Sequence, residues 1–228
     1  MNPFVIFDLD DTLVDSTGAI DSWFVELAEL RALGPEGLAF LRAEQQRPVS
    51  PAESFRAIVE EFGFPETPAE LQRDFATRLP QLARTFVGAP DGLRALRHYG
   101  WRTALLTNGM RTEQWEKMRD LHELFDHVCY ADDEPARKPD PAIFRLVADR
   151  AGESLDGAWM VGDSLTNDIA GGAAMGMSTM WVSGTQELPP DGPRPDVVVR
   201  TIAEAFPILL SMSGPVNVHP ARQLYAAG

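Results

Sequence analysis

The sequence predicts an α/β protein with a Rossmann-like parallel sheet core and an inserted α-helical cap domain. Short apolar runs that are typical of strands occur before residue 16, and after residue 86 they alternate with helical patterns. Strands that alternate with helices usually form a parallel sheet covered on both faces. In between, only helical periodicity occurs. We therefore expect the core at 1–15 and 87–212, the cap at 16–86, and a flexible C-terminal tail at 213–228.

The first element is a short buried strand, because four consecutive apolar residues span Phe4 to Phe7. Asp8 and Asp10 follow it, and they would face the same side if the strand simply continued. Two carboxylates at the end of a buried strand repel each other and lose hydration, so they need a cation or a shared proton. The alternative is a strand end with solvated acids, since Asp is common in turns.

The inserted segment contains apolar residues at helical spacing. They are Ile20, Trp23, Phe24, Leu27 and Leu30, and then Phe55, Ile58, Val59 and Phe62. Breaks rich in glycine and proline at 34–35, 48–51 and 63–68 divide the segment into about four helices. Ser50 to Glu53 forms a capping-box pattern, and no stretch of the segment is typical of a strand. Trp23 and Phe24 could line a substrate pocket, but at helical spacing with Ile20 and Leu27 we expect them to lie in the core of the cap.

The remainder of the core alternates regularly. The expected strands are 101–106, 127–131, 159–161, 179–182 and 197–199. The expected helices are 91–98, 111–121, 141–149, 167–175 and 201–210. The carboxyl ends of parallel strands meet at one edge of the sheet, where ligands bind, so residues far apart in the sequence converge there.

Composition narrows the class of partner. A net charge of −14 at pH 7 makes the surface repel nucleic-acid backbones and anionic membranes. Cys129 is the only cysteine, which excludes a disulfide within the chain and is compatible with a reducing compartment. We see no pattern of a signal peptide or a transmembrane helix, and we expect a cytoplasmic protein. A monomer and a homodimer both remain open.

Polar side chains follow three of the predicted strands. They are Asp8 and Asp10, Thr107 and Asn108, and Asp163 with Asp168. Acids brought together from two strands form a hard-oxygen site that suits Mg²⁺. A threonine hydroxyl, an asparagine amide and the backbone amides after Gly109 suit phosphate oxygens at a helix N-terminus.

The chain contains two lysines against 18 arginines. Lys138 stands just before a helix, where a compact point charge would serve a phosphate site; a surface lysine is an equally good interpretation. Lys117 lies within a helix beside Glu113 and Glu116, and we expect it to be a solvated ion-pair partner.

Four segments, taken together, resemble a known family. They are Asp8-Leu9-Asp10-Asp11-Thr12-Leu13, Leu106-Thr107-Asn108-Gly109, Lys138-Pro139, and Gly162-Asp163-Ser164 followed by Asn167-Asp168. In this order and spacing they resemble the four motifs of the haloacid dehalogenase superfamily. The insertion resembles the helical cap of one major subgroup. The segment after Gly109, with Gln114 and Lys117, looks most like the nucleotidase and N-acylneuraminate-9-phosphatase branch.

The resemblance implies a role for each matching residue. Asp8 would be the nucleophile that forms an aspartyl phosphate, and Asp10 the general acid and later the general base. Thr107, Asn108 and Lys138 would bind the phosphoryl group, with Thr107 and Lys138 also offsetting its charge during transfer.

The resemblance also implies a Mg²⁺ cofactor. Asp8, the backbone carbonyl of Asp10, and Asp163 would hold the ion, and Asp168 would orient the metal shell or Lys138. These residues imply a phosphomonoesterase that acts on a small phosphorylated metabolite, such as a nucleoside monophosphate or a sugar phosphate.

Other activities of the superfamily fit less well. Dehalogenases lack the second aspartate, because halide needs no proton, so Asp10 argues against that activity. Phosphonate hydrolases use a cap lysine, and 16–86 contains none. A phosphosugar mutase, or a catalytically idle binding protein with this fold, remains an alternative. We expect the cap to close on hinges at 15–18 and 87–90, with Gln45, Gln46 and Arg47 either facing the site or solvated.

Overall fold

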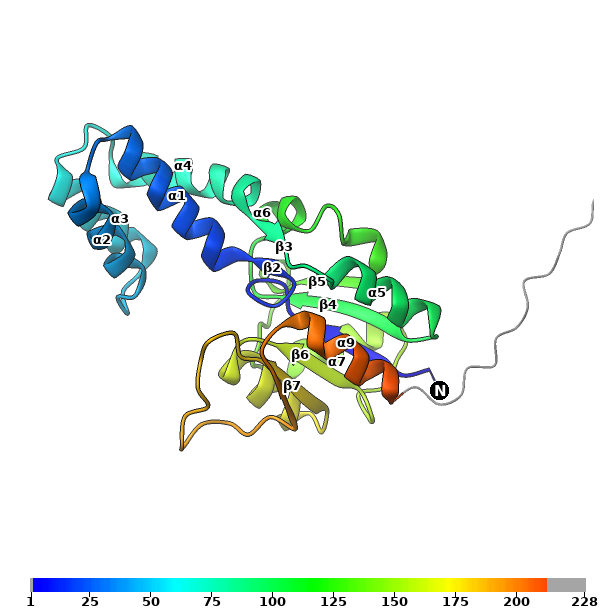
Figure 1. Ribbon diagram of the computed structural model, residues 1–228. Helices are drawn as coiled ribbons and strands as arrows, with labels where there is room; N and C mark the ends of the chain where they lie inside the picture. The colour runs from blue at the N-terminus through cyan, green and yellow to red at the C-terminus, as the bar shows by residue number, and fades with distance from the viewer. Residues whose placement is uncertain (1, 213–228) are drawn as a thin grey trace, which may run out of the picture.

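A computed structural model describes residues 2–212, so the predicted tail at 213–228 lies outside the described residues. Six strands form one parallel sheet in the order β5-β4-β1-β6-β7-β8 (Figure 1). The strands are β1 (Phe4–Phe7), β4 (Arg102–Thr107), β5 (His127–Tyr130), β6 (Trp159–Gly162), β7 (Ser178–Val182) and β8 (Val197–Val199). This sheet confirms the predicted α/β core.

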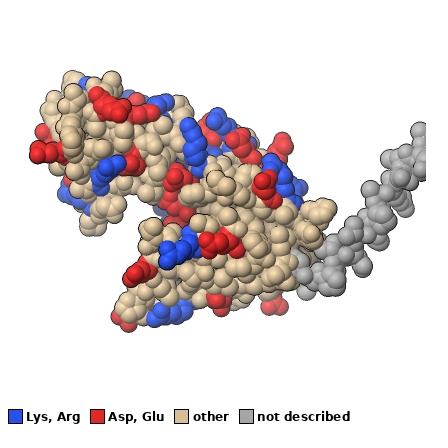
Figure 2. Space-filling model, viewed as in Figure 1, with Lys and Arg blue, Asp and Glu red and all other residues tan. Residues whose placement is uncertain are grey.

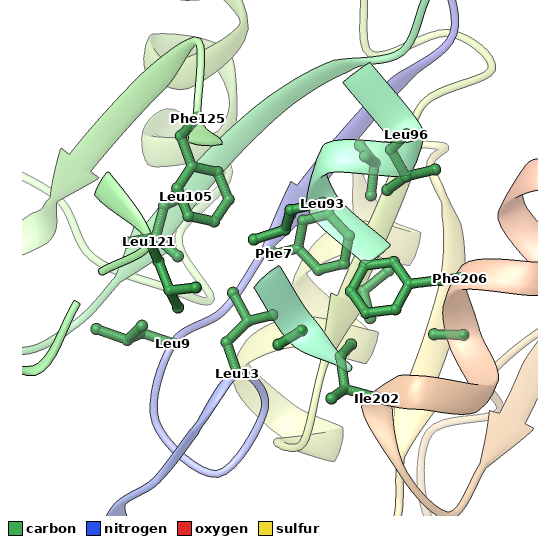
Figure 3. Close-up of a cluster of buried hydrophobic side chains, with 14 of the residues drawn as sticks. Phe7, Leu9, Leu13, Leu93, Leu96, Leu105, Leu121, Phe125, Ile202 and Phe206 are labelled. Carbon is green, nitrogen blue, oxygen red and sulfur yellow. The ribbon is translucent and has the colours of Figure 1, made fainter. Parts of the chain in front are cut away.

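Alternate residues of the central strand face two separate hydrophobic layers, as the period of two in a strand requires. Phe7 packs into the layer beneath α5 (Ala89–His98) and α9 (Ile202–Ser211), and its ring contacts that of Phe206 (Figure 3). Ile6 packs into the layer beneath α7 (Pro141–Ala151) on the opposite face. Burial on both faces fixes β1 at the centre of the sheet and therefore fixes where Asp8 begins.

The cap consists of four helices, as the breaks in the sequence predict. They are α1 (Ser16–Leu30), α2 (Gly34–Gln45), α3 (Pro51–Phe62) and α4 (Pro68–Leu82). These helices pack around a hydrophobic cluster of their own, in which Trp23 and Phe24 are buried as expected. Figure 1 shows the cap projecting to one side of the sheet, with α1 and α4 leading back to the core.

Two cap helices begin with the same device. The predicted capping box at Ser50 and Glu53 is present at the start of α3. A second box, at Thr67 and Glu70, begins α4 and was not predicted, although it has the same spacing. In each box the hydroxyl and the glutamate satisfy backbone N–H groups that the first turn would leave unpaired.

The chain passes between core and cap through a short antiparallel ribbon. This ribbon pairs β2 (Val14–Asp15) with β3 (Arg84–Thr85). The prediction that 16–86 contains no strand is therefore wrong at its last few residues. A two-residue strand has no apolar period of its own, and only its pairing with a segment far away in the sequence defines it.

Two helices of the core are shorter or more irregular than predicted. α6 ends at Lys117 rather than at 121, and the predicted helix at 167–175 is a π-helix followed by one short α-helix. These elements are α6 (Arg111–Lys117), η1 (His122–Leu124), η2 (Ala131–Asp133), the π-helix η3 (Leu165–Ala170) and α8 (Gly171–Ala174). Among the described residues, no helix has the length and apolar character needed to cross a membrane.

Candidate active site

The carboxyl ends of β1, β4 and β6 open into one cavity of about 300 Å³. Every residue predicted for the site lines this cavity. The lining consists of Asp8, Asp10, Asp11, Thr107, Asn108, Gly109, Lys138, Asp163, Ser164, Asn167 and Asp168. Acidic side chains gather at the junction between cap and core on the face shown in Figure 2.

Lys138 lies between two carboxylates at the bottom of this cavity. Its Nζ donates a hydrogen bond to Oδ1 of Asp8 and another to Oδ1 of Asp168, the latter at 2.8 Å. The lysine is 3% exposed. Burial alone would lower the pKa of Lys138, but the charges of Asp168 and Asp8 raise it above its ordinary value, so the ammonium stays protonated.

Asp168 is held on both of its oxygens. Oδ1 accepts from Lys138, and Oδ2 accepts from the backbone N–H of Ser164 at 3.0 Å. Gly162 makes this approach possible, because a Cβ at that position would lie 2.2 Å from Oδ2 of Asp168. Asp168 is thus placed to orient Lys138.

Burial makes Asp8 and Asp163 difficult to ionise. It raises the pKa of Asp8 well above its ordinary value; Lys138 opposes this shift and the charge of Asp168 adds to it. Burial, with the charges of Asp168 and Asp11, raises the pKa of Asp163 to about 7. One lysine therefore does not balance the acids at this edge of the sheet.

A divalent cation would offset this excess of negative charge. Asp8, Asp163 and Asp168 each offer a carboxylate oxygen, and these oxygens lie within 4.8 Å of one another. Hard cations prefer such oxygen ligands. Because Asp168 already binds Lys138 and Ser164, Asp8 and Asp163 are the better candidates for direct contact with an ion.

The second motif supports Lys138 from the opposite side. The Asn108 amide Nδ2 donates to the backbone oxygen of Lys138, and its Oδ1 accepts from the backbone N–H of Lys138, both at 2.9 Å. The Asn108 side chain therefore fixes the backbone of the lysine. Thr107 is buried, and its hydroxyl oxygen accepts from the N–H of Gly109 at 3.2 Å.

Asp10 lies in a different environment from Asp8. Its Oδ1 accepts from Lys117 Nζ at 2.7 Å and from the Ser16 hydroxyl, and its Oδ2 accepts from Gln114 Nε2 at 2.7 Å. Burial alone would raise the pKa of Asp10, but the charge of Lys117 and these hydrogen bonds hold it below its ordinary value.

The expectation that Lys117 is a solvated ion-pair partner is wrong. Its side chain is 4% exposed and pairs with Asp10 across 107 positions of sequence. The neighbouring Glu113 and Glu116 suggested a surface helix. Glu116 is exposed, but Glu113, four residues before Lys117 and on the same face of α6, is half-buried. The scarcity of lysine, which drew attention to Lys138, applied equally to Lys117 and was the signal that could have found it.

The polar loop of the cap lies apart from the catalytic cavity. Arg47 is exposed and pairs with the buried Glu44 at 2.8 Å, and Gln46 is exposed. A cavity of about 210 Å³ within the cap is lined in part by Arg47, Ile20 and Phe24.

A model of the haloacid dehalogenase-like hydrolases matches residues 4–176, the stretch that contains all of the residues just described. The chain belongs to this family. The predicted superfamily and the predicted hydrolase are therefore confirmed.

Two phosphatases resemble the chain over most of its length. It is 30% identical over 195 residues to glyceraldehyde 3-phosphate phosphatase from Pyrococcus abyssi, covering 78% of this chain and 79% of that protein. It is 28% identical over 195 residues to pyrimidine 5'-nucleotidase PynA from Streptococcus pneumoniae, covering 78% of this chain and 82% of that protein. The fold matches that of the HAD-hydrolase YfnB from Bacillus subtilis with a TM-score of 0.74 and 24% sequence identity. The match covers 91% of this chain and 98% of YfnB, whose crystal structure is described as bound to magnesium.

Proposed function

We propose that this hydrolase is a Mg²⁺-dependent phosphomonoesterase that acts through an aspartyl phosphate on Asp8. The observation that carries the proposal is the buried pairing of Asp8 with Lys138, with a second, separately held carboxylate at Asp10. The alcohol portion of a phosphate ester leaves as an alkoxide, which needs a proton, and Asp10 is the group able to supply it.

The reaction proceeds in two halves. In the first, a carboxylate oxygen of Asp8 attacks phosphorus, the ester P–O bond breaks, and the leaving oxygen takes a proton from Asp10, which must enter this step in its protonated form. In the second, Asp10 takes a proton from water as the water oxygen attacks phosphorus. The P–O bond to Asp8 then breaks, inorganic phosphate leaves, and both aspartates return to their starting states.

The other residues support this transfer by charge and position. Lys138 and the hydroxyl of Thr107 bind the phosphoryl oxygens, and Asn108 and Asp168 hold Lys138 in place. Asp8, Asp163 and the backbone carbonyl of Asp10 would hold Mg²⁺. The bound ion supplies positive charge that offsets repulsion between the Asp8 carboxylate and the anionic phosphoryl group.

The substrate is a small phosphorylated metabolite, of the nucleoside monophosphate or sugar phosphate class. The names of the two relatives support this class, since one refers to a triose phosphate and the other to pyrimidine nucleotides. The catalytic cavity contains groups for the phosphate but few for an organic leaving group. We assign recognition of that group to the cap, which closes over the core and excludes water.

A phosphate-release screen over nucleoside monophosphates and sugar phosphates tests the proposal. Release from at least one of these classes is expected with Mg²⁺, and excess EDTA should abolish it until Mg²⁺ is restored. Full activity in excess chelator would exclude the metal site. Interconversion of a sugar phosphate without phosphate release would identify a mutase instead.

A further inference from the structure

Three side chains hold the carboxylate of Asp10, and two of them come from α6. Gln114 donates to Oδ2 and Lys117 to Oδ1, each at 2.7 Å. A spacing of three residues places both side chains on one face of that helix. The third donor is Ser16, the first residue of the cap helix α1. Each oxygen of Asp10 thus receives a donor from α6.

Stability alone does not explain this arrangement. Gln114 and Lys117 are both buried, and among residues 2–212 the Oε1 atom of Gln114 finds no hydrogen-bond partner. A buried polar atom without a hydrogen-bond partner destabilises the folded protein. A buried ion pair adds little net stability relative to apolar packing. The amide of Gln114 is turned so that its N–H meets Asp10, at the expense of its own oxygen.

The strand end of the second motif makes room for this contact. A Cβ at position 109 would lie 1.8 Å from Nε2 of Gln114. Glycine at this position therefore lets Gln114 reach past the end of β4 to Asp10. Asp10 still lines the catalytic cavity, and its side chain is 34% exposed, so a ligand in the cavity can reach it.

We propose that Gln114 and Lys117 are positioning residues for proton transfer to the leaving group. They fix the direction in which Asp10 presents its oxygens to the cavity, and they do not touch the substrate. This role rests on the proposed function, in which Asp10 protonates the leaving oxygen. If Asp10 points in another direction, it can no longer form a hydrogen bond to that oxygen. The resulting fall in kcat/KM then depends on how strongly the leaving group needs a proton.

Two esters of similar size separate this effect from general damage. Phenol is a much weaker acid than p-nitrophenol, so phenyl phosphate needs the proton far more than p-nitrophenyl phosphate does. In Lys117→Met and Gln114→Leu we expect kcat/KM to fall about tenfold or more for phenyl phosphate and only about twofold for p-nitrophenyl phosphate. Lys117→Arg, which keeps the donor and the charge, should recover part of the phenyl phosphate activity.

A matched control removes a positive charge from the same stretch of chain. Arg119 lies two residues after Lys117 and is exposed, so Arg119→Met should leave both rates unchanged. Thermal unfolding checks that each variant folds. If Lys117→Met fails to fold, Gln114→Leu still decides the matter, because it removes a hydrogen bond without removing a charge.

The Asp10→Asn variant distinguishes failure of the positioning role from failure of the proposed function. A selective loss of phenyl phosphate activity in Asp10→Asn, with equal losses for both esters or no loss in the α6 variants, would overturn the positioning role alone. A wild-type protein that hydrolyses neither ester, or an Asp10→Asn variant without selectivity, would overturn the proposed function and the positioning role together.

Discussion

Asp8 and Asp10 stand two residues apart, each paired with one of the two lysines of the chain, yet their surroundings act in opposite directions. Asp8 shares Lys138 with Asp168 and lies near Asp163, and burial raises its pKa. Asp10 has Lys117 together with two neutral donors, and its pKa is lowered despite burial.

This difference indicates which carboxylate depends on a cation. Around Asp10 the positive charge and the hydrogen bonds suffice for the carboxylate. Around Asp8 three acids share one lysine, so further positive charge is needed before Asp8 can act as a nucleophile. A pair of aspartates whose environments differ in this way can take separate roles in one reaction.

The largest effect should come from removing the carboxylate of Asp8. Asp8→Asn should lower kcat by at least about 10⁴-fold for every ester, because a neutral amide cannot form the acyl phosphate. Phosphate release by the purified variant measures this. Asp156→Asn, on the exposed surface, is the control and should remain active. Substantial turnover by folded Asp8→Asn would exclude the covalent route.

Removal of Lys138 should slow hydrolysis of every ester, whereas removal of Lys117 should slow mainly one class of ester. Lys138→Met should lower kcat/KM about 10³-fold for phenyl phosphate and p-nitrophenyl phosphate alike, because Lys138 offsets the charge of the phosphoryl group itself. Lys117→Met should affect mainly the ester with the poorer leaving group. Equal profiles for the two lysine variants would contradict the division between phosphoryl binding and proton transfer.

The cap should influence the choice of substrate more than the chemistry. Because the polar loop lies apart from the catalytic cavity, this prediction depends on closure of the cap over the core. Arg47→Ala or Gln46→Ala should then change the ranking of substrates by kcat/KM about tenfold while changing hydrolysis of p-nitrophenyl phosphate less. Arg56→Ala, an exposed arginine on α3, provides the control. If cap substitutions lower all activities equally, selection must lie in the core.

The smallest effect concerns stability without metal. Because the pKa of Asp163 is raised to about 7, the folded protein binds more protons than the unfolded chain between the ordinary carboxyl range and that value. The contribution of Asp163 to stability therefore falls as pH rises through this window. In EDTA we expect the Tm of the wild type to fall from pH 5 to pH 7.5 relative to that of Asp163→Asn. Parallel curves for the two proteins would show that Asp163 ionises normally.

The sequence by itself determined the elements whose signals are local. Each of these elements can be recognised from a few neighbouring residues. They are the apolar run before Asp8, the four cap helices, the capping box at Ser50 and the polar strand ends. Parallel topology then requires those strand ends to meet, which is why every predicted site residue lines one cavity.

Only the tertiary structure decided the contacts between distant segments. The pairing of Lys117 with Asp10, the hold of Asn108 on Lys138 and the ribbon formed by β2 and β3 each join parts of the chain that no short pattern connects. Whether a charged side chain is buried depends on the partner that the fold brings to it, and neighbours in sequence do not reveal that partner. Lys117 is buried because Asp10 lies at the end of a strand beside α6, and this proximity exists only after the chain has folded.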